Sequence, residues 1–214
     1  MALDALVFDA YGTLYDVHSV IKRCETCWPG KGMQLSIAWR AKQLEYTWQR
    51  SLMQRYVPFS TVTREALEFA CESMGLALDR ARLQSLMDEY LDLKVYPDVA
   101  PALQGYKAKK AILSNGSPDM LWPLVRSSGL KFDAVLSVDE VKIFKPAPQV
   151  YQIAVEKLGV PKDRIGFVSS NCWDALGAKS FGFTVFWINR ANAPVERLGF
   201  HPDKIVRSLE EILV

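Results

Sequence analysis

The chain has 214 residues, of which 50% are hydrophobic and 23% are charged, a balance typical of a globular protein with a sizeable core. This length fits one domain, or one domain with a modest insertion. The net charge is +2 and the basic residues are scattered, which argues against nucleic acid or an anionic membrane as a partner. We find no signal peptide and no apolar run of ~18 residues, and we expect a cytoplasmic protein.

The first part of the chain predicts one buried strand followed by helices. Residues 5–9 form a short apolar strand, and residues 36–56 carry apolar side chains at helical spacing without Gly or Pro. Two further helical patterns cover residues 63 to 75 and 80 to 93. We therefore expect an all-helical insertion of about 80 residues, which is long for a simple connection between strands.

After Pro97 the predicted elements alternate between strands and helices. The expected strands are residues 111–113, 134–136, 165–168 and 184–188, and the expected helices are residues 118–128, 148–158 and 173–181. This alternation predicts an α/β fold in which a parallel sheet carries helices on both faces. Functional groups gather at the carboxyl ends of such strands, where Asp9, Ser114 and Ser169 fall.

The cysteines do not suggest a metal centre. Cys24 and Cys27 form a CxxC motif, but no second pair exists, and His18 and His201 are the only histidines. A zinc site is therefore not expected. A redox dithiol stays open as an alternative, although we favour two reduced thiols packed in a helix.

Four segments carry the strongest functional signal, and they occur in a fixed order along the chain. Residues 9–16 read Asp-Ala-Tyr-Gly-Thr-Leu-Tyr-Asp, and the others are residues 113–117, 145–146 and 169–175. Together they resemble the motifs of the haloacid dehalogenase (HAD) superfamily over nearly the whole chain. Their detailed wording, with the helix at 39–48, resembles the L-2-haloacid dehalogenases.

The resemblance implies a fold and an activity. It implies a HAD-like Rossmannoid core at residues 1–15 and 98–214, with an inserted helical cap domain at residues 16–97. The implied reaction is hydrolysis of short L-2-haloalkanoic acids to D-2-hydroxy acids, with inversion at C2. The substrate would be a small 2-haloacid, no cofactor or metal would be needed, and the chain would form a homodimer.

Two positions depart from the phosphatases of the superfamily. Tyr11 replaces the second Asp that protonates a leaving alkoxide, and Ser170 replaces an Asp that holds magnesium. An alkyl halide suits such a site, because halide leaves without a proton. A phosphatase or phosphonatase is the runner-up, and a non-catalytic binding protein is a competitor from another class. A nucleotide-binding dehydrogenase is excluded, because no GxGxxG follows a strand.

In the implied mechanism Asp9 is the nucleophile that attacks C2 and forms an ester. Lys145 would lie close to Asp9 and Asp174, where a charge pair at 4 Å is worth ~4 kcal/mol and favours ionised carboxylates. Asp174 would orient Lys145 and activate the hydrolytic water. The plainer alternatives are helix caps for the two carboxylates and an exposed surface position for Lys145.

The remaining candidates surround the substrate. Arg40 would receive the halide with help from Asn115, and Ser114, Asn115 and Lys145 would hold the carboxylate. Backbone amides at Ala10 and Tyr11 would stabilise the oxyanion. The expected apolar wall is Tyr11, Leu44, Phe59 and Trp173, and the expected supports of the carboxylates are Thr13, Tyr151, Ser169 and Asn171. A solvated helix arginine and ordinary turn residues are the competing interpretations.

Overall fold

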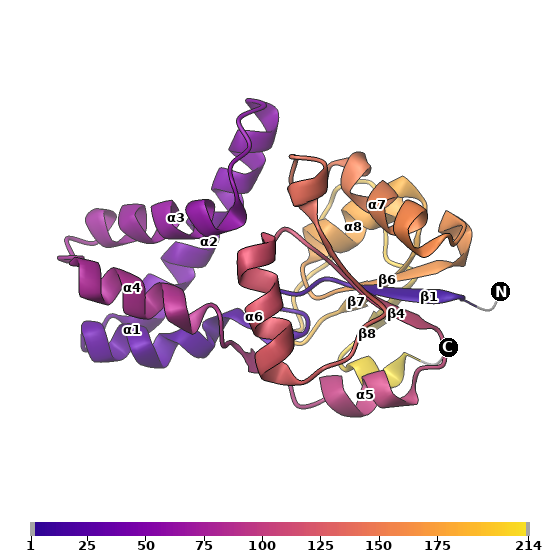
Figure 1. Ribbon diagram of the computed structural model, residues 1–214, viewed down its shortest axis with the longest axis horizontal. Coiled ribbons are helices and arrows are strands. Elements are labelled where there is room, and N and C mark those ends of the chain that lie inside the picture. Colours follow the sequence, from indigo (N-terminus) through magenta and orange to yellow (C-terminus); the bar gives the residue numbers. More distant parts are fainter. Residues whose placement is uncertain (1–2, 213–214) are drawn as a thin grey trace. The chain divides into compact units, whose positions relative to one another are not determined.

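A six-stranded parallel sheet forms the centre of one part of the chain (Figure 1). The computed structural model describes residues 3–212, so the ends of the predicted core, residues 1–2 and 213–214, lie outside it. The strand order is β5-β4-β1-β6-β7-β8. The strands are β1 (Ala5–Phe8), β4 (Lys109–Ser114), β5 (Ala134–Ser137), β6 (Ile165–Ser169), β7 (Thr184–Ile188) and β8 (Lys204–Val206).

Strand β1 lies between β4 and β6, and all four of its residues are buried. Phe8, its last residue, pairs with Ile112 of β4 and with Val168 of β6. Because these three strands are parallel and in register, their carboxyl ends meet at one edge of the sheet. The predicted strand-end positions of Asp9, Ser114 and Ser169 are therefore confirmed.

Helices lie on both faces of this sheet. Helices α7 (Pro148–Leu158) and α8 (Cys172–Phe181) are on one side, and α5 (Val99–Gly105) is on the other (Figure 1). Proline occupies the first turn of α7, where its missing N–H removes no helical hydrogen bond, and Gly159 ends the helix in the left-handed conformation. The predicted doubly covered parallel sheet is confirmed.

Contacts divide the chain into two compact units. The sheet unit contains residues 1–15, 95–115 and 130–214, and the helical unit contains residues 16–94 and 116–129. The predicted cap spans 16–97 and the predicted core includes α6 (Pro118–Ser128), whereas in the structure α6 groups with the helical unit. Two short strands, β2 (Tyr15–Asp16) and β3 (Lys94–Val95), pair where the chain passes between the units.

The helical unit is built on α2 (Gly32–Leu52), which packs against both α1 (Ile21–Cys27) and α3 (Phe59–Ser73). Helix α4 (Arg80–Glu89) packs against α1 and α3, and α6 packs against α3. The buried face of α2 carries Leu35 and Trp39 at helical spacing. Within residues 3–212, no helix is both long and apolar enough to cross a membrane.

Predicted and observed elements differ mainly at their ends. The helix predicted at residues 36–56 is Gly32–Leu52, and the pattern that we began at residue 63 begins at Phe59, after Pro58. The pattern 80–93 ends at Glu89. Helix α5 and strand β8 were not predicted, because seven and three residues contain too few periods to show a pattern.

Candidate active site

Asp9 follows β1 and is only 5% exposed. Its Oδ2 accepts hydrogen bonds from Thr13 Oγ1 at 3.0 Å and from Asn171 Nδ2 at 2.8 Å. Its Oδ1 accepts from Lys145 Nζ at 3.1 Å. The chain after Asp9 forms a turn rather than a helix, so the side chain does not act as a helix cap.

The turn that follows Asp9 is braced by the loop after β6. Gly12 has φ +88°, a left-handed conformation that favours glycine, and its carbonyl accepts from Ser170 Oγ at 2.5 Å. The backbone N–H of Ser170 donates to Thr13 Oγ1 at 2.8 Å. Thr13 can therefore point its hydroxyl hydrogen at Asp9 while its oxygen accepts from Ser170. Ser170 supports this turn with its backbone N–H and its hydroxyl.

Lys145 is 1% exposed and bridges two carboxylates. Its Nζ lies 3.1 Å from Asp9 Oδ1 and 2.8 Å from Asp174 Oδ2. Its backbone N–H donates to Asn115 Oδ1 at 2.9 Å, which ties the residue to the loop after β4. The expected proximity of the three charged groups is thus confirmed, and the surface-lysine alternative is wrong.

Asp174 is fully buried in the first turn of α8, with Asn171 at the N-cap position. Its Oδ2 accepts from Lys145, and its Oδ1 accepts from the Tyr151 hydroxyl at 2.8 Å. The helix-cap alternative is therefore wrong for this side chain. Tyr151 can approach because Gly177 has no side chain, since a Cβ there would lie 2.6 Å from the Tyr151 hydroxyl oxygen.

Burial and charge act in opposite directions on these groups. Burial raises the pKa of Asp174 to about 6, with a further rise from the charge of Asp9, while Lys145 and the Tyr151 hydrogen bond lower it. Burial lowers the pKa of Lys145, but the charges of Asp174 and Asp9 outweigh it and leave a net rise. Lys145 thus stays protonated, and Asp174 is mainly ionised only above about pH 6.

A divalent cation does not fit this set of donors. The Lys145 ammonium already lies between the two carboxylates, and the Ser170 hydroxyl donates to Gly12. Hard cations such as magnesium prefer carboxylate and carbonyl oxygens, and an ammonium beside them opposes a second positive charge. Among residues 3–212, no group of three or more His, Cys, Asp or Glu side chains could hold a metal ion.

Other predicted site residues lie in the same unit. Ser114 and Ser169 are fully buried at the ends of β4 and β6, and Ser169 Oγ accepts from the backbone N–H of Asn171 at 3.1 Å. Tyr11 is 2% exposed, and its carbonyl accepts from Asn171 Nδ2 at 3.0 Å. Ala10 is also fully buried in this turn, and Trp173 is half-buried in α8.

Arg40, Leu44 and Phe59 belong to the helical unit. Arg40 and Leu44 are half-buried on α2, one turn apart, and Phe59 is the buried first residue of α3. Arg40 Nη1 donates to Gln43 Oε1 at 2.6 Å. The interpretation of Arg40 as a purely solvated helix residue therefore does not hold.

The sequence did not single out Gln43, Ser170 as a brace, or Trp187. The Trp187 indole N–H donates to the Ser170 carbonyl at 3.0 Å. Its position in a buried strand gave no sign of this contact, which joins β7 to the loop after β6. Gln43 did carry a signal, since it lies three residues after Arg40, where helical side chains are neighbours.

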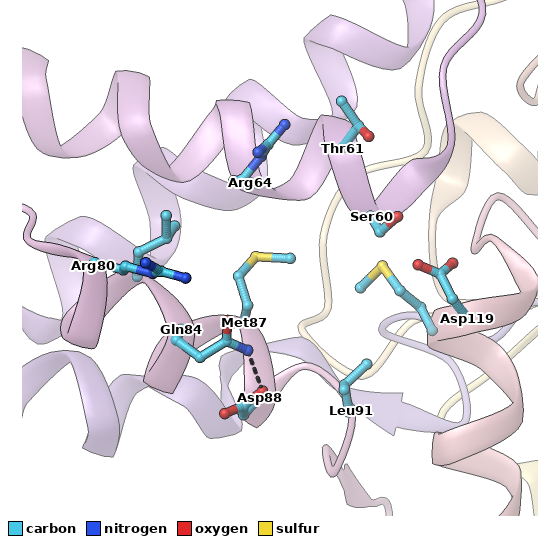
Figure 2. Close-up of a pocket in the computed structure, with 11 residues that line it drawn as sticks. Ser60, Thr61, Arg64, Arg80, Gln84, Met87, Asp88, Leu91 and Asp119 are labelled. Carbon is cyan, nitrogen blue, oxygen red and sulfur yellow. Dashed lines mark hydrogen bonds between the residues drawn. The ribbon is translucent and has the colours of Figure 1, made fainter.

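The helical unit has a pocket of about 460 Å³ between α3, α4 and α6 (Figure 2). Met87 and Leu91 contribute apolar surface, while Arg64 and Asp119 contribute opposite charges. None of the predicted site residues lines this pocket. Its two arginines are matched by two aspartates, so its charge favours no particular ligand.

The CxxC motif lies on α1, where Cys24 is buried and Cys27 is half-buried. Burial raises the pKa of Cys24 to about 12, with further rises from Cys27 and Cys71. Reactive thiols have lowered pKa values, so this shift opposes a redox role for Cys24. The four cysteines are all free, as the preferred interpretation of reduced, packed thiols requires.

Comparison with known proteins agrees with the fold. A family model described as haloacid dehalogenase-like hydrolase matches residues 3–182, and the chain belongs to this family. It is 48% identical to (S)-2-haloacid dehalogenase H-109 of Pseudomonas putida, over 98% of this chain and 96% of the relative.

Solved structures give the same result. The crystal structure of an L-2-haloacid dehalogenase matches with a TM-score of 0.94 and 46% identity, covering 98% of this chain and 96% of the other. The L-2-haloacid dehalogenase of Xanthobacter autotrophicus with chloropropionic acid covalently bound matches with a TM-score of 0.92 and 42% identity. That match covers 97% of this chain and 96% of the other.

Proposed function

We propose that this chain is an (S)-2-haloacid dehalogenase, which hydrolyses short L-2-haloalkanoic acids to D-2-hydroxy acids. The observation that carries the proposal is the buried cluster in which Lys145 bridges Asp9 and Asp174. Relatives with this activity in their names cover almost the whole chain. A related structure that holds chloropropionic acid covalently supports an ester intermediate.

In the first step a lone pair of Asp9 forms a bond to C2 while the carbon–halogen bond breaks. The halide leaves with the bonding electron pair, and attack from the opposite side inverts C2. Asp9 Oδ2 accepts two hydrogen bonds and Oδ1 accepts one, so Oδ1 keeps more lone-pair density for the attack. We assign the nucleophilic oxygen to Oδ1.

In the second step water attacks the carbonyl carbon of the Asp9 ester. Asp174 takes one proton from the water, the bond between the ester carbonyl carbon and the alkoxide oxygen breaks, and the alkoxide takes up the other water proton to give the hydroxy acid. Asp174 then releases its proton to solvent, and both carboxylates are regenerated. Thr13 and Asn171 donate to Oδ2 and would hold the ester carbonyl in place. Backbone amides at Ala10 and Tyr11 are the proposed additional donors to the oxyanion.

The remaining assignments concern the substrate and the halide. Arg40 and Asn115 would stabilise the departing halide, and Ser114, Asn115 and Lys145 would hold the substrate carboxylate. The alkyl group would meet the apolar wall formed by Tyr11, Leu44, Phe59 and Trp173. Tyr151 would hold Asp174 in place through its hydroxyl hydrogen bond. Ser169 would hold the Asn171 backbone, whose N–H donates to the Ser169 hydroxyl oxygen.

The proposal includes a homodimer in the cytoplasm. Large apolar side chains are exposed on the helical unit, including Met33 (56%), Ile37 (53%) and Leu52 (85%) on α2. Exposed apolar side chains of this size favour a protein interface. Light scattering tests the dimer: a dimer has twice the chain mass of 24.2 kDa in solution, and a mass of one chain would reject it.

An isotope experiment tests the mechanism. In one turnover with enzyme in excess in heavy-oxygen water, the label should enter the Asp9 carboxylate while the hydroxy acid stays unlabelled. Label that appears at once in the product would show direct attack of water on C2 and would reject Asp9 as nucleophile.

A substrate panel tests the selectivity. L-2-chloropropionate should yield D-lactate, the D enantiomer should be inert, and a generic phosphatase substrate should release no phosphate.

The matched variants for this test are Asp9→Asn and Asp16→Asn. Asp16 is the nearest other carboxylate in the first motif, and its side chain accepts from the backbone N–H of His18. Asp9→Asn should abolish halide release, whereas Asp16→Asn should retain it. An equal loss of halide release in both variants would mean that the first motif tolerates no change. The Asp9 variant would then no longer support Asp9 as the nucleophile.

A further inference from the structure

Gln43 is a fully buried polar residue on α2 that the mechanism above does not use. A primary amide has two donors and an acceptor, and burial without partners for them is costly. In this chain both ends of the amide are engaged. Partners come from α2 itself and from α3, which packs against it, and a further hydrogen bond joins Gln43 to Tyr90 at the end of α4.

Gln43 lies in a chain of three hydrogen bonds that all run in one direction, from Arg40 through Gln43 and Thr63. Arg40 Nη1 donates to Gln43 Oε1 at 2.6 Å, and Gln43 Nε2 donates to Thr63 Oγ1 at 2.7 Å. The Thr63 hydroxyl in turn donates to the Phe59 carbonyl at 2.8 Å. Because that carbonyl engages the Thr63 hydrogen, the threonine oxygen acts as acceptor toward Gln43. The amide oxygen is thereby directed toward Arg40.

Neighbouring aromatic side chains hold this relay of Arg40, Gln43 and Thr63 in place. The Trp39 indole N–H donates to the Thr63 carbonyl at 2.7 Å, and the Trp39 ring packs on Tyr90 at 4.6 Å between centroids. Burial raises the pKa of Tyr90 to about 12, opposed by the charge of Arg40 and by a hydrogen bond with Gln43. Gln43 therefore lies within a packed layer that leaves its side chain one orientation.

We propose that Gln43 is a positioning residue that fixes the guanidinium of Arg40 for its work on the departing halide. A neutral amide can orient a guanidinium without cancelling its charge, whereas a carboxylate in the same place would form an ion pair. The inference rests on the proposed function of Arg40. The new element is that the hydrogen bonds through Gln43 and Thr63 determine how much Arg40 contributes to the rate of halide release.

The first test is Gln43→Met, which keeps the length of the side chain and removes its hydrogen bonds to Arg40, Thr63 and Tyr90. The rate of halide release in a single turnover should fall about tenfold or more, because a misplaced group costs rate even when it is still present. The loss should be larger for 2-chloropropionate than for 2-bromopropionate, because chloride is the poorer leaving group and needs more stabilisation. A merely structural role would lower both rates by the same factor and would overturn the proposal.

The control is Gln49→Met on the same helix. Gln49 is exposed and donates to Glu45, one turn away. This variant should keep both the rate and the ratio between the two substrates. A change in the ratio like that of Gln43→Met would show that the effect is general to α2, and would also overturn the proposal.

A double-mutant cycle separates this inference from the proposed function itself. Arg40→Ala should lose most of the rate, and Gln43→Met should cause little further loss in that background, since it acts through Arg40. If Arg40→Ala keeps near-full turnover, the proposed function of Arg40 fails. If Arg40→Ala is slow and Gln43→Met lowers the rate by its full factor again, only the positioning role fails.

Thr63→Val provides a second variant if Gln43→Met does not fold. It removes only the hydroxyl that holds the amide nitrogen, and it should lower the rate with the same preference against 2-chloropropionate. Thr63→Ser keeps the hydroxyl and should restore the rate and the ratio. Unchanged kinetics in folded Thr63→Val would show that the relay does not matter.

Discussion

The two units of the molecule hold their polar residues by different means. In the sheet unit Asp9 and Lys145 lie on two separate loops and Asp174 lies in the first turn of α8. All three are almost completely buried, so each depends on the charge of another. In the helical unit Arg40 is half-buried and donates a hydrogen bond to a neutral side chain three residues away. Buried charges make a site and a fold interdependent, whereas a half-buried residue that contacts a neutral partner can be removed at a smaller cost to folding.

The largest expected effect tests this difference directly. Lys145→Met should lower the free energy of unfolding by about 3–5 kcal/mol, because two buried carboxylates lose their shared cation. Halide release should fall by at least about 100-fold. Urea denaturation at pH 7.5 and single-turnover kinetics measure the two effects.

The contrast is Arg40→Ala, which should lose turnover while its free energy of unfolding falls by only about 1–2 kcal/mol, the cost of removing the donor to the buried Gln43 oxygen. Lys142→Met is the surface control, since Lys142 is 60% exposed in its ion pair with Asp139. If Lys145→Met proved as stable as Lys142→Met, the sheet unit would not depend on its buried charges.

Tyr151→Phe should have an intermediate effect, which appears in the pH dependence of turnover. The hydroxyl stabilises ionised Asp174, so its loss should raise the pKa of Asp174 above about 6. Because Asp174 must be ionised to accept a proton, turnover should increase as pH rises through that pKa. The acid limb of the profile should therefore move to higher pH in the variant, with a greater loss at pH 6 than at pH 8.5.

Tyr106→Phe is the matched control for this profile. Tyr106 is also buried, but its hydroxyl donates to the Leu209 carbonyl. Removing it should leave the acid limb in place even if stability falls. A limb that moves equally in both variants would assign the shift to general loosening of the sheet unit rather than to Asp174.

Removal of metal ions is expected to have no effect on halide release. Exhaustive chelation should leave halide release unchanged, because Lys145 occupies the place between the two carboxylates and Ser170 is engaged with Gly12. A magnesium-dependent phosphatase in the same chelator provides the control for metal removal. Activity that disappears and returns with added magnesium would revive the phosphatase alternative.

The sequence predicted most of the fold because most elements are long enough to show a period. The strand ends at Asp9, Ser114 and Ser169 followed from apolar runs, and the proximity of Lys145 to the carboxylates followed from the motifs. The Gln43–Thr63 contact could not be predicted, because periodicity gives the face of a helix and not which polar atoms meet across two helices.

The Asp174 pKa was equally beyond the sequence. We expected Lys145 to keep the carboxylates ionised, but complete burial raises the Asp174 pKa more than the lysine lowers it. That balance depends on how much water the folded chain excludes, which residue types alone do not give. The same applies to Ser170, whose role as a brace depends on the close approach of its loop to Gly12.

The like charges of Asp9 and Asp174 have a consequence for the order of events. The charge of Asp9 raises the pKa of Asp174 in the resting cluster. In the proposed mechanism the first step turns Asp9 into a neutral ester, and this repulsion disappears while Lys145 remains beside Asp174. Asp174 is then more fully ionised at the stage when water must be activated. Formation of the Asp9 ester therefore makes Asp174 a better proton acceptor, and Asp174 then activates the water that frees Asp9.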